Sequence, residues 1–271
     1  MLEASDGEIS ELLDAIYTEY HHDFRGYAMA SLRRRLSFAM TRLGCESLAD
    51  LYAKLKDEPT AFTELLQHLT VQVSDLFRDP SFFRTMREQV VPVLQTYPLL
   101  RIWVAGCSTG EELYSLAILL DEEGLLERTT LYATDINPHA LRAAEAGIYP
   151  LDRMGAFTEN HRLAGGKGSL SRYYTAAYGS AVFDRSLRKQ VVFADHSLAT
   201  DSVFAEVQVV SCRNVIIYFD RGLQERALGL MADSLCRRGF LGLGSRESLQ
   251  FTEQRFAFRE LTPSERWYQR T

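Results

Sequence analysis

The stretch "VAGCSTGEELYS" (residues 104–115) decides the fold class of this 271-residue chain. Its first half continues an apolar run from Leu99 and is typical of a buried strand, whereas the residues after Gly110 begin an apolar helix. A glycine-rich turn between a strand and a helix is typical of doubly wound α/β sheets, which bind ligands at the carboxyl ends of their strands. We therefore expect Gly106 and its neighbours to line a ligand site.

The acids beside this turn indicate what the ligand is. Gly106 and Gly110 have the spacing Gly-x-x-x-Gly, which matches neither the dinucleotide fingerprint nor the P-loop. Glu111 and Glu112 occupy the first helical turn, where their charge would repel a pyrophosphate. S-adenosylmethionine fits better, because it carries an ammonium, a sulfonium and a ribose diol but no phosphate. We expect Glu112 to accept a hydrogen bond from the ammonium.

A second acid supports this cofactor. Asp135 ends the next predicted strand, where such folds place the acid that accepts hydrogen bonds from ribose hydroxyls. Taken singly, Glu111, Glu112 and Asp135 are equally well explained as residues that favour helix starts. On adjacent strands together, they favour the cofactor.

Outside this stretch, the apolar pattern divides the chain in two. From residue 8 to residue 94 apolar side chains recur at helical spacing. From residue 99 onward strands and helices alternate, which predicts a parallel sheet with helices on both faces. The predicted strands are 99–105, 130–134, 189–194, 206–211 and 239–244, and the helices are 111–120, 138–146 and 223–235. The last β-like runs, 256–261 and 266–270, are expected to pair antiparallel at the sheet edge.

The alternation breaks between residues 155 and 188. There the tyrosine-rich "SRYYTAAYGSAVF" (171–183) predicts a small inserted β-subdomain with a hairpin around Gly179. The sequence thus predicts a helical domain with a linker over 1–94 and an α/β domain over 95–271.

Composition excludes several classes of function. The 30 basic and 36 acidic side chains give a net charge of −6, which argues against a nucleic-acid partner. The four cysteines and six histidines lack the spacing of metal ligands, so no metal is expected. No apolar signal segment opens the sequence, and its longest apolar stretch (113–120) is too short to cross a bilayer. We expect a reduced, cytoplasmic protein that does not insert into the membrane.

Four stretches resemble the chemotaxis receptor methyltransferases of the CheR family. They are "TVQVSDLFRD" (70–79), "GCSTGEELYSLAILL" (106–120), "LYATDINPHALRAAEAGIY" (131–149) and "SCRNVIIYFD" (211–220). The resemblance implies methyl transfer from S-adenosylmethionine to glutamate side chains in the cytoplasmic domain of membrane chemoreceptors, with S-adenosylhomocysteine as product. It also implies a helical N-terminal domain, a class I S-adenosylmethionine-dependent methyltransferase domain with a Rossmann-like doubly wound sheet, and a β-rich insertion used in receptor docking.

The resemblance also assigns roles to residues. It implies that Arg78 orients the acceptor carboxylate and that Tyr218 faces the methyl group. The cofactor-binding residues that it implies are Gln72, Ser74, Arg78, Gly106, Glu112, Asp135, Ser197, Leu198, Arg213 and Asn214. Gln72, Ser74, Leu76 and Ser197 depart from the residues usual in the family. A hydroxyl cannot replace an amide's paired donor and acceptor, so Asp195 or His196 is an alternative to Ser197 at the adenine.

The two catalytic candidates also have purely structural interpretations. Arg78 would then form an ion pair with Asp79 or Glu112, and Tyr218 would be an aromatic side chain packed at a strand end. In the helical domain, arginines flank the apolar stripe of one helix. They are Arg33, Arg34, Arg35 and Arg42, and most are expected to point away from the core and to steer acidic receptor helices.

Two other functions stay open from the sequence. One is an S-adenosylmethionine-dependent methyltransferase of another substrate, such as a small acid or RNA. The other is a non-catalytic signalling adaptor that binds S-adenosylmethionine. A dehydrogenase is disfavoured, because the acids of the first helical turn would repel its dinucleotide.

Overall fold

The computed structural model describes residues 4–262 and 264–271, and the chain forms two compact units. The first unit comprises Met1–Gln72 together with Ser197–Asp201 and Tyr218–Ala227. The second unit comprises Val73–His196, Ser202–Ile217 and Leu228–Thr271.

The first unit is built on four helices. They are α1 (Asp6–Tyr20), α2 (Met29–Leu43), α3 (Leu48–Asp57) and α4 (Ala61–Leu69). Ser47 and Asp50 form a capping box at the start of α3, and Gly44, with φ 70°, ends α2 in the left-handed conformation. The predicted apolar stripe of α2 is buried, with Leu32 and Leu36 among its most enclosed side chains. The helical pattern predicted for this region is confirmed.

A distant segment completes this unit. Tyr27 and Phe219 form an isolated antiparallel bridge, and the Asp220 amide donates to the Gly26 carbonyl at 2.7 Å. Gly26 has no room for a side chain, because an added Cβ would lie 2.8 Å from Leu223 Cβ. The segment Tyr218–Ala227 therefore folds with the N-terminal helices.

The second unit is built on a sheet whose described strands have the order β6-β2-β1-β7-β8-β10-β9. The strands are β1 (Leu100–Ala105), β2 (Thr129–Asp135), β6 (Val191–Asp195), β7 (Val207–Cys212), β8 (Leu235–Leu243), β9 (Phe258–Thr262) and β10 (Trp267–Arg270). The first five strands of that order are parallel, and β10 pairs antiparallel with β8 and β9. Both the parallel sheet and its antiparallel edge pair were predicted, and both are confirmed.

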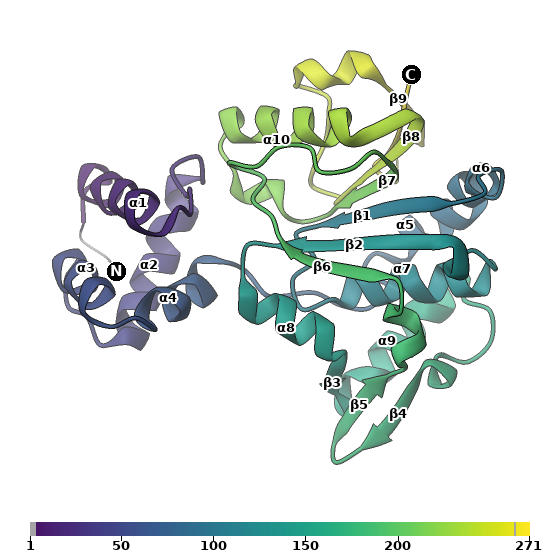
Figure 1. The fold of residues 1–271 in the computed structure, drawn as a ribbon, viewed down its shortest axis with the longest axis horizontal. Coiled ribbons are helices and arrows are strands. Elements are labelled where there is room, and N and C mark those ends of the chain that lie inside the picture. Colours follow the sequence, from purple (N-terminus) through teal and green to yellow (C-terminus); the bar gives the residue numbers. More distant parts are fainter. Residues whose placement is uncertain (1–3, 263) are drawn as a thin grey trace. The chain divides into compact units, whose positions relative to one another are not determined.

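Helices cover this sheet on both faces (Figure 1). Helices α7 (Glu111–Glu122) and α8 (Pro138–Ala146) lie on one face, and the part of α10 (Arg221–Ser234) that belongs to this unit lies on the other. Before β1 the chain forms α5 (Pro80–Thr85), a π-helical turn (Met86–Val90) and α6 (Val91–Leu94). Short 3-10 turns span Leu126–Arg128, Leu151–Arg153, Leu170–Tyr173, Arg185–Arg188, Ile216–Tyr218 and Glu253–Ala257.

The predicted domain boundary at residue 94 does not coincide with the division into units. Phe82, Phe83 and Met86 are buried in the core of the second unit, so the helices from residue 80 onward belong there. Helical periodicity alone could not separate them from the first four helices, because both sets have the same apolar spacing.

The predicted insertion forms a separate small sheet in the order β3-β5-β4. Its elements are β3 (Ile148–Pro150), α9 (Met154–Leu163), β4 (Tyr174–Ala177) and β5 (Ser180–Phe183). Strands β4 and β5 form the expected hairpin (Figure 1). Tyr178 and Gly179 connect them, both with positive φ (49° and 75°), as tight two-residue hairpin turns require.

Candidate functional site

The site lies at the carboxyl ends of the parallel strands. The strand order reverses between β1 and β7, which is the position of the ligand crevice in doubly wound sheets. Gly106 follows β1 with φ 70°, and Gly110 precedes α7 with φ 94°. An added Cβ would lie 2.5 Å from Val215 Cγ2 at the first position and 2.8 Å from Ala144 Cβ at the second. Both predicted glycines are therefore required by the turn itself.

Asp135 closes this turn from strand β2. Its Oδ2 accepts from the Ser108 amide and its Oδ1 from the Asn137 amide, both at 2.9 Å. Burial raises the pKa of Asp135, and the backbone amides partly oppose this rise. Each carboxylate oxygen has two acceptor positions, so Asp135 can still accept from ribose hydroxyls as predicted.

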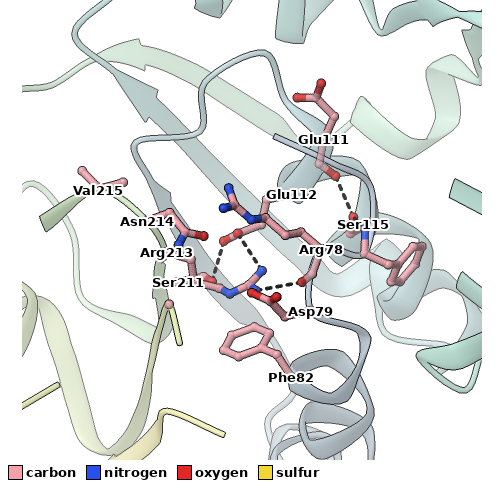
Figure 2. Close-up of polar contacts among 12 residues, drawn as sticks. Arg78, Asp79, Phe82, Glu111, Glu112, Ser115, Ser211, Arg213, Asn214 and Val215 are labelled. Carbon is pink, nitrogen blue, oxygen red and sulfur yellow. Dashed lines mark hydrogen bonds and ion pairs between the residues drawn. The ribbon is translucent and has the colours of Figure 1, made fainter. Parts of the chain in front are cut away.

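Glu112 is the second acid at the crevice. Its Oε1 accepts from Ser211 Oγ at 2.6 Å, and its Oε2 accepts from Arg213 Nη1 at 3.1 Å. Acceptor positions are left for an ammonium. Figure 2 shows that Glu111 points in another direction. The Glu111 carboxylate accepts instead from Thr109 at 2.7 Å and from Arg153 at 2.9 Å.

Arg213 lies between two acids (Figure 2). Besides Glu112, its guanidinium contacts Asp79 Oδ2 at 2.8 Å and the carbonyl oxygen of Arg78 at 2.7 Å. It also lies over the Phe82 ring, 4.1 Å from the centroid, and its side chain is only 1% exposed. The guanidinium is thus committed to protein groups, and its predicted cofactor contact stays a prediction.

The segment that carries Arg78 has an unusual backbone. Phe77 and Asp79, on either side of Arg78, have φ values of 51° and 55°, which residues other than glycine seldom adopt. Such conformations persist only where the surroundings impose them, and they cluster at functional sites. Here Ser115 Oγ accepts from the Phe77 amide at 2.7 Å, and Arg213 holds the Arg78 carbonyl.

Two side chains from the residues that follow β3 hold the preceding part of this segment. Arg153 donates to the Ser74 carbonyl and pairs with Asp75 at 3.0 Å. Asn160 Nδ2 donates to the Leu76 carbonyl at 3.1 Å. The backbone from residue 74 to residue 78 is therefore fixed by side chains of the second unit.

The Arg78 side chain itself has few partners. Its Nη1 donates to the Val73 carbonyl at 3.3 Å, and within the described residues it forms no ion pair. Asp79 and Glu112, the two acids that the sequence offered as its partners, pair with Arg213 instead. The purely structural interpretation of Arg78 is not supported.

Glu247 is a residue of the site that sequence analysis missed. Its carboxylate is buried and accepts from the amides of Asn214, Val215 and Gly244 at 2.9, 2.9 and 2.7 Å. A fourth bond comes from the Ile217 amide at 3.3 Å. Burial raises the pKa of Glu247, and these amide bonds oppose the rise. No sequence signal was available, because the acid lies in an irregular stretch.

The predicted site residues are divided between the units. The first unit contains Gln72, Ser197, Leu198 and Tyr218. The second unit contains Ser74, Arg78, Gly106, Glu112, Asp135, Arg213 and Asn214. Ser197 Oγ accepts from the Ala199 amide at 3.2 Å. His196 Nδ1 is buried without a hydrogen-bond partner in the described chain. The roles of these residues at the adenine stay predictions.

Arg35 differs from the expectation for the basic helix. Its guanidinium lies over the Tyr218 ring, 4.2 Å from the centroid, donates to the Leu69 carbonyl, and is buried. Arg33 pairs with Asp6, whereas Arg34 and Arg42 are exposed. Arg35 points inward because the apolar stripe of α2 extends to its position.

No group of three or more His, Cys, Asp or Glu side chains could hold a metal ion in residues 4–262 and 264–271. In the same part of the chain, no helix has the length and apolar character needed to span a membrane.

Two family models together match most of the chain. Residues 7–70 match the all-alpha domain of CheR methyltransferase, and residues 72–264 match its SAM binding domain. The class I methyltransferase fold and S-adenosylmethionine as cofactor, both predicted, are confirmed by this match and by the observed sheet. When bound, the cofactor supplies an electrophilic methyl group, and Glu112 and Asp135 are the acids that would hold it.

Named relatives agree with the family models. A Pseudomonas putida protein named methyltransferase Cher3 is 54% identical over 98% of this chain and 98% of its own length. Chemotaxis protein methyltransferase 2 of Pseudomonas aeruginosa is 33% identical over 79% of this chain and 76% of its own. Chemotaxis protein methyltransferase of Listeria innocua is 29% identical over 84% of both chains. This chain therefore belongs to the CheR methyltransferase family.

Proposed function

We propose that this chain transfers the methyl group of S-adenosylmethionine to glutamate side chains of chemoreceptors, forming methyl esters in the adaptation of chemotaxis-type signalling. Relatives named chemotaxis protein methyltransferase support the pathway. The proposed partner is the cytoplasmic domain of a membrane receptor, which places the enzyme in the cytoplasm. The exposed edge of β4 is the proposed docking site for a C-terminal receptor tail.

The observation that carries the glutamate acceptor is the state of Arg78. Arg213 pairs with both Asp79 and Glu112, the two acids that the sequence offered as partners for Arg78. Apart from the bond from Nη1 to the Val73 carbonyl, the planar donor fork of Arg78 is left for an anionic group, and a carboxylate is the shape that it binds best. An uncharged acceptor would gain less from this arrangement, because hydrogen bonds between ionised groups are stronger than those to a neutral oxygen.

The chemistry of a carboxylate acceptor fits a site made for alignment. A glutamate side chain is ionised at neutral pH and needs no general base. Correct alignment of reacting groups can contribute ~7–11 kcal/mol. The side chains that fix residues 74–78 hold the backbone that carries Arg78, which favours alignment. Tyr218 is proposed as a second hydrogen-bond donor to the acceptor.

The proposal is tested with labelled S-adenosylmethionine and cytoplasmic receptor fragments. We expect label in the receptor that mild alkali releases as methanol, because glutamate esters are base-labile. Arg78→Ala should lower kcat by ~10- to 100-fold, the equivalent of losing a charged hydrogen bond, with Arg78→Lys in between. The matched control is Arg101→Ala, an exposed arginine near the amino end of β1, away from the crevice.

The outcomes separate the alternative functions. Label in RNA or in a small acid, with none in receptor fragments, would identify a methyltransferase of another substrate. Tight cofactor binding without transfer to any acceptor would identify a signalling adaptor. Full turnover by Arg78→Ala would remove Arg78 from the proposed mechanism.

A further inference from the structure

Glu247 follows strand β8 and has an environment unusual for an acid. It is 3% exposed, and its four hydrogen bonds all come from backbone amides. Three of these amides belong to the loop after β7, and the fourth belongs to Gly244, directly after β8. Converging amides form a local positive site for a carboxylate, and here the protein's own side chain fills it.

The loop that Glu247 holds has a backbone that needs support. Asn214 has φ 60°, a left-handed conformation with a cost for this residue. Gly244 must lack a side chain, since an added Cβ would lie 2.7 Å from Glu247 Oε2 and 2.8 Å from the Asn214 amide nitrogen. The ends of β7 and β8 are thus packed tightly around one carboxylate.

The same loop contacts the turn at residues 106–110, which we call the cofactor turn. The Val215 side chain covers Gly106, so closely that an added Cβ would lie 2.5 Å from Val215 Cγ2. Gly106 and Val215 follow β1 and β7, the two strands between which the strand order reverses. The contact between them therefore sets the width of the crevice at the position where doubly wound sheets bind their ligands.

We infer that Glu247 is a positioning residue for S-adenosylmethionine. It fixes the loop after β7, that loop fixes Val215 against Gly106, and this contact holds the cofactor turn in its binding conformation. Glu247 acts through these groups rather than by touching the cofactor or the acceptor. The inference depends on the cofactor and not on the identity of the methyl acceptor.

Calorimetry with S-adenosylhomocysteine tests the role of Glu247 in the full chain. Glu247→Gln keeps the size of the side chain but turns an NH2 group toward amide donors. We expect a loss of affinity of about tenfold or more, with Glu247→Asp in between. In turnover with receptor fragments, the KM for S-adenosylmethionine should rise while the KM for receptor stays at the parental value.

Glu122→Gln is the matched control. The Glu122 side chain is 2% exposed, pairs with Arg87 and His161, and lies at the end of α7 opposite to Glu112. This variant also removes a buried carboxylate, so Tm should fall. Its affinity for S-adenosylhomocysteine should stay parental, because Glu122 contacts neither the cofactor turn nor the loop after β7.

Parental affinity in Glu247→Gln, with a lowered Tm like that of the control, would overturn the inference. If Glu247→Gln does not fold, Glu247→Asp and Val215→Ala decide. Val215→Ala opens the space over Gly106 but keeps the amide bonds to Glu247, and it should also weaken binding. Parental affinity in both would overturn the inference. If the variants lose affinity for S-adenosylhomocysteine as expected but the parent protein methylates no receptor fragment, the inference stands and only the proposed acceptor is contradicted.

Discussion

Glu111 and Glu112 are neighbours in the sequence, yet their side chains bind different partners. Successive residues of a helix point about 100° apart, so the two carboxylates face different surroundings. Glu111 joins Arg153 and thereby the segment before Arg78, whereas Glu112 joins Ser211 and Arg213 at the crevice. The turn after β1 is therefore connected both to the cofactor side and to the acceptor side of the proposed reaction.

Asp135 is expected to be the main determinant of ribose binding. Asp135→Asn keeps one carbonyl oxygen for the amides but loses the charge and acceptor positions, so S-adenosylhomocysteine should bind ~10- to 100-fold more weakly. Because burial raises the pKa of Asp135 above 3.8, parental affinity should fall as pH falls, at a higher pH than for an ordinary aspartate. This fall should be absent in the variant.

Calorimetry at several pH values measures both effects. The control is Asp233→Asn, an exposed acid on α10. NAD should give no heat with either protein. Parental affinity in Asp135→Asn would show that the ribose is held elsewhere.

Arg213 is expected to keep Arg78 available. In Arg213→Met, Asp79 loses its partner and is free to pair with its neighbour Arg78. Turnover should fall by ~10-fold or more, because a paired Arg78 would no longer donate a charged hydrogen bond to the acceptor. Adding Asp79→Asn to Arg213→Met should restore part of the turnover, although Asp79→Asn alone should not raise it.

This double-mutant cycle is measured as kcat at saturating cofactor and receptor, after Tm shows that each variant is folded. Additive losses in the double variant would mean that Arg213 has only a structural role.

At the scale of elements, α2 presents a basic face formed by Arg34, Phe38 and Arg42, which are exposed and four residues apart. Arg42 lies 5.3 Å from the centroid of Phe38. Acidic receptor helices would be attracted to this face.

Arg34→Glu combined with Arg42→Glu should raise the KM for receptor and reduce its dependence on salt. The affinity for S-adenosylhomocysteine should not change. Exposed charges contribute ~0–1 kcal/mol each and are screened over about 8 Å at physiological salt, so steady-state kinetics at low salt is the sensitive measurement. Arg237→Glu with Arg255→Glu, two exposed arginines of the second unit, makes the same change in net charge. Equal effects in both pairs would leave α2 without a specific role.

The sequence predicted elements far better than the contacts between them. Each strand of the main sheet and the hairpin at Gly179 were visible, because periodicity and turn chemistry are local. Strand β3 was missed, because its three residues are too few to show a pattern and it pairs with β5, far along the chain. Arg35 and Glu247 were missed or misplaced for the same reason, since their partners are distant in sequence.

The site was predictable where chemistry fixes sequence position. Glycines at a strand end and an acid at the next strand end follow from the geometry of the ligand, so Gly106, Glu112 and Asp135 could be named. The paired state of Arg213, which follows β7, depends on Glu112 of α7 and on Arg78 and Asp79 just before α5, and no spacing in the sequence encodes it.

At the scale of the whole molecule, the two units alternate along the chain. Tyr218–Ala227 belongs to the helical unit, although the residues before and after it belong to the sheet unit. The Asp220 amide donates to Gly26, and Arg35 lies over Tyr218, so this segment depends on the N-terminal helices for its conformation. The helical unit is therefore part of the scaffold of a predicted catalytic residue.

Removal of residues 1–70 should consequently affect the segment 218–227 more than the sheet. Hydrogen exchange should become faster at the Asp220 amide, which loses its acceptor, whereas the amides of β1, β2 and β7 should keep their protection because their partners lie within the sheet unit. Gly26→Val in the full chain is a milder test, since its side chain would collide with Leu223. It should speed exchange in the same segment and lower turnover. Unchanged exchange there in both proteins would mean that the segment keeps its conformation without the helices.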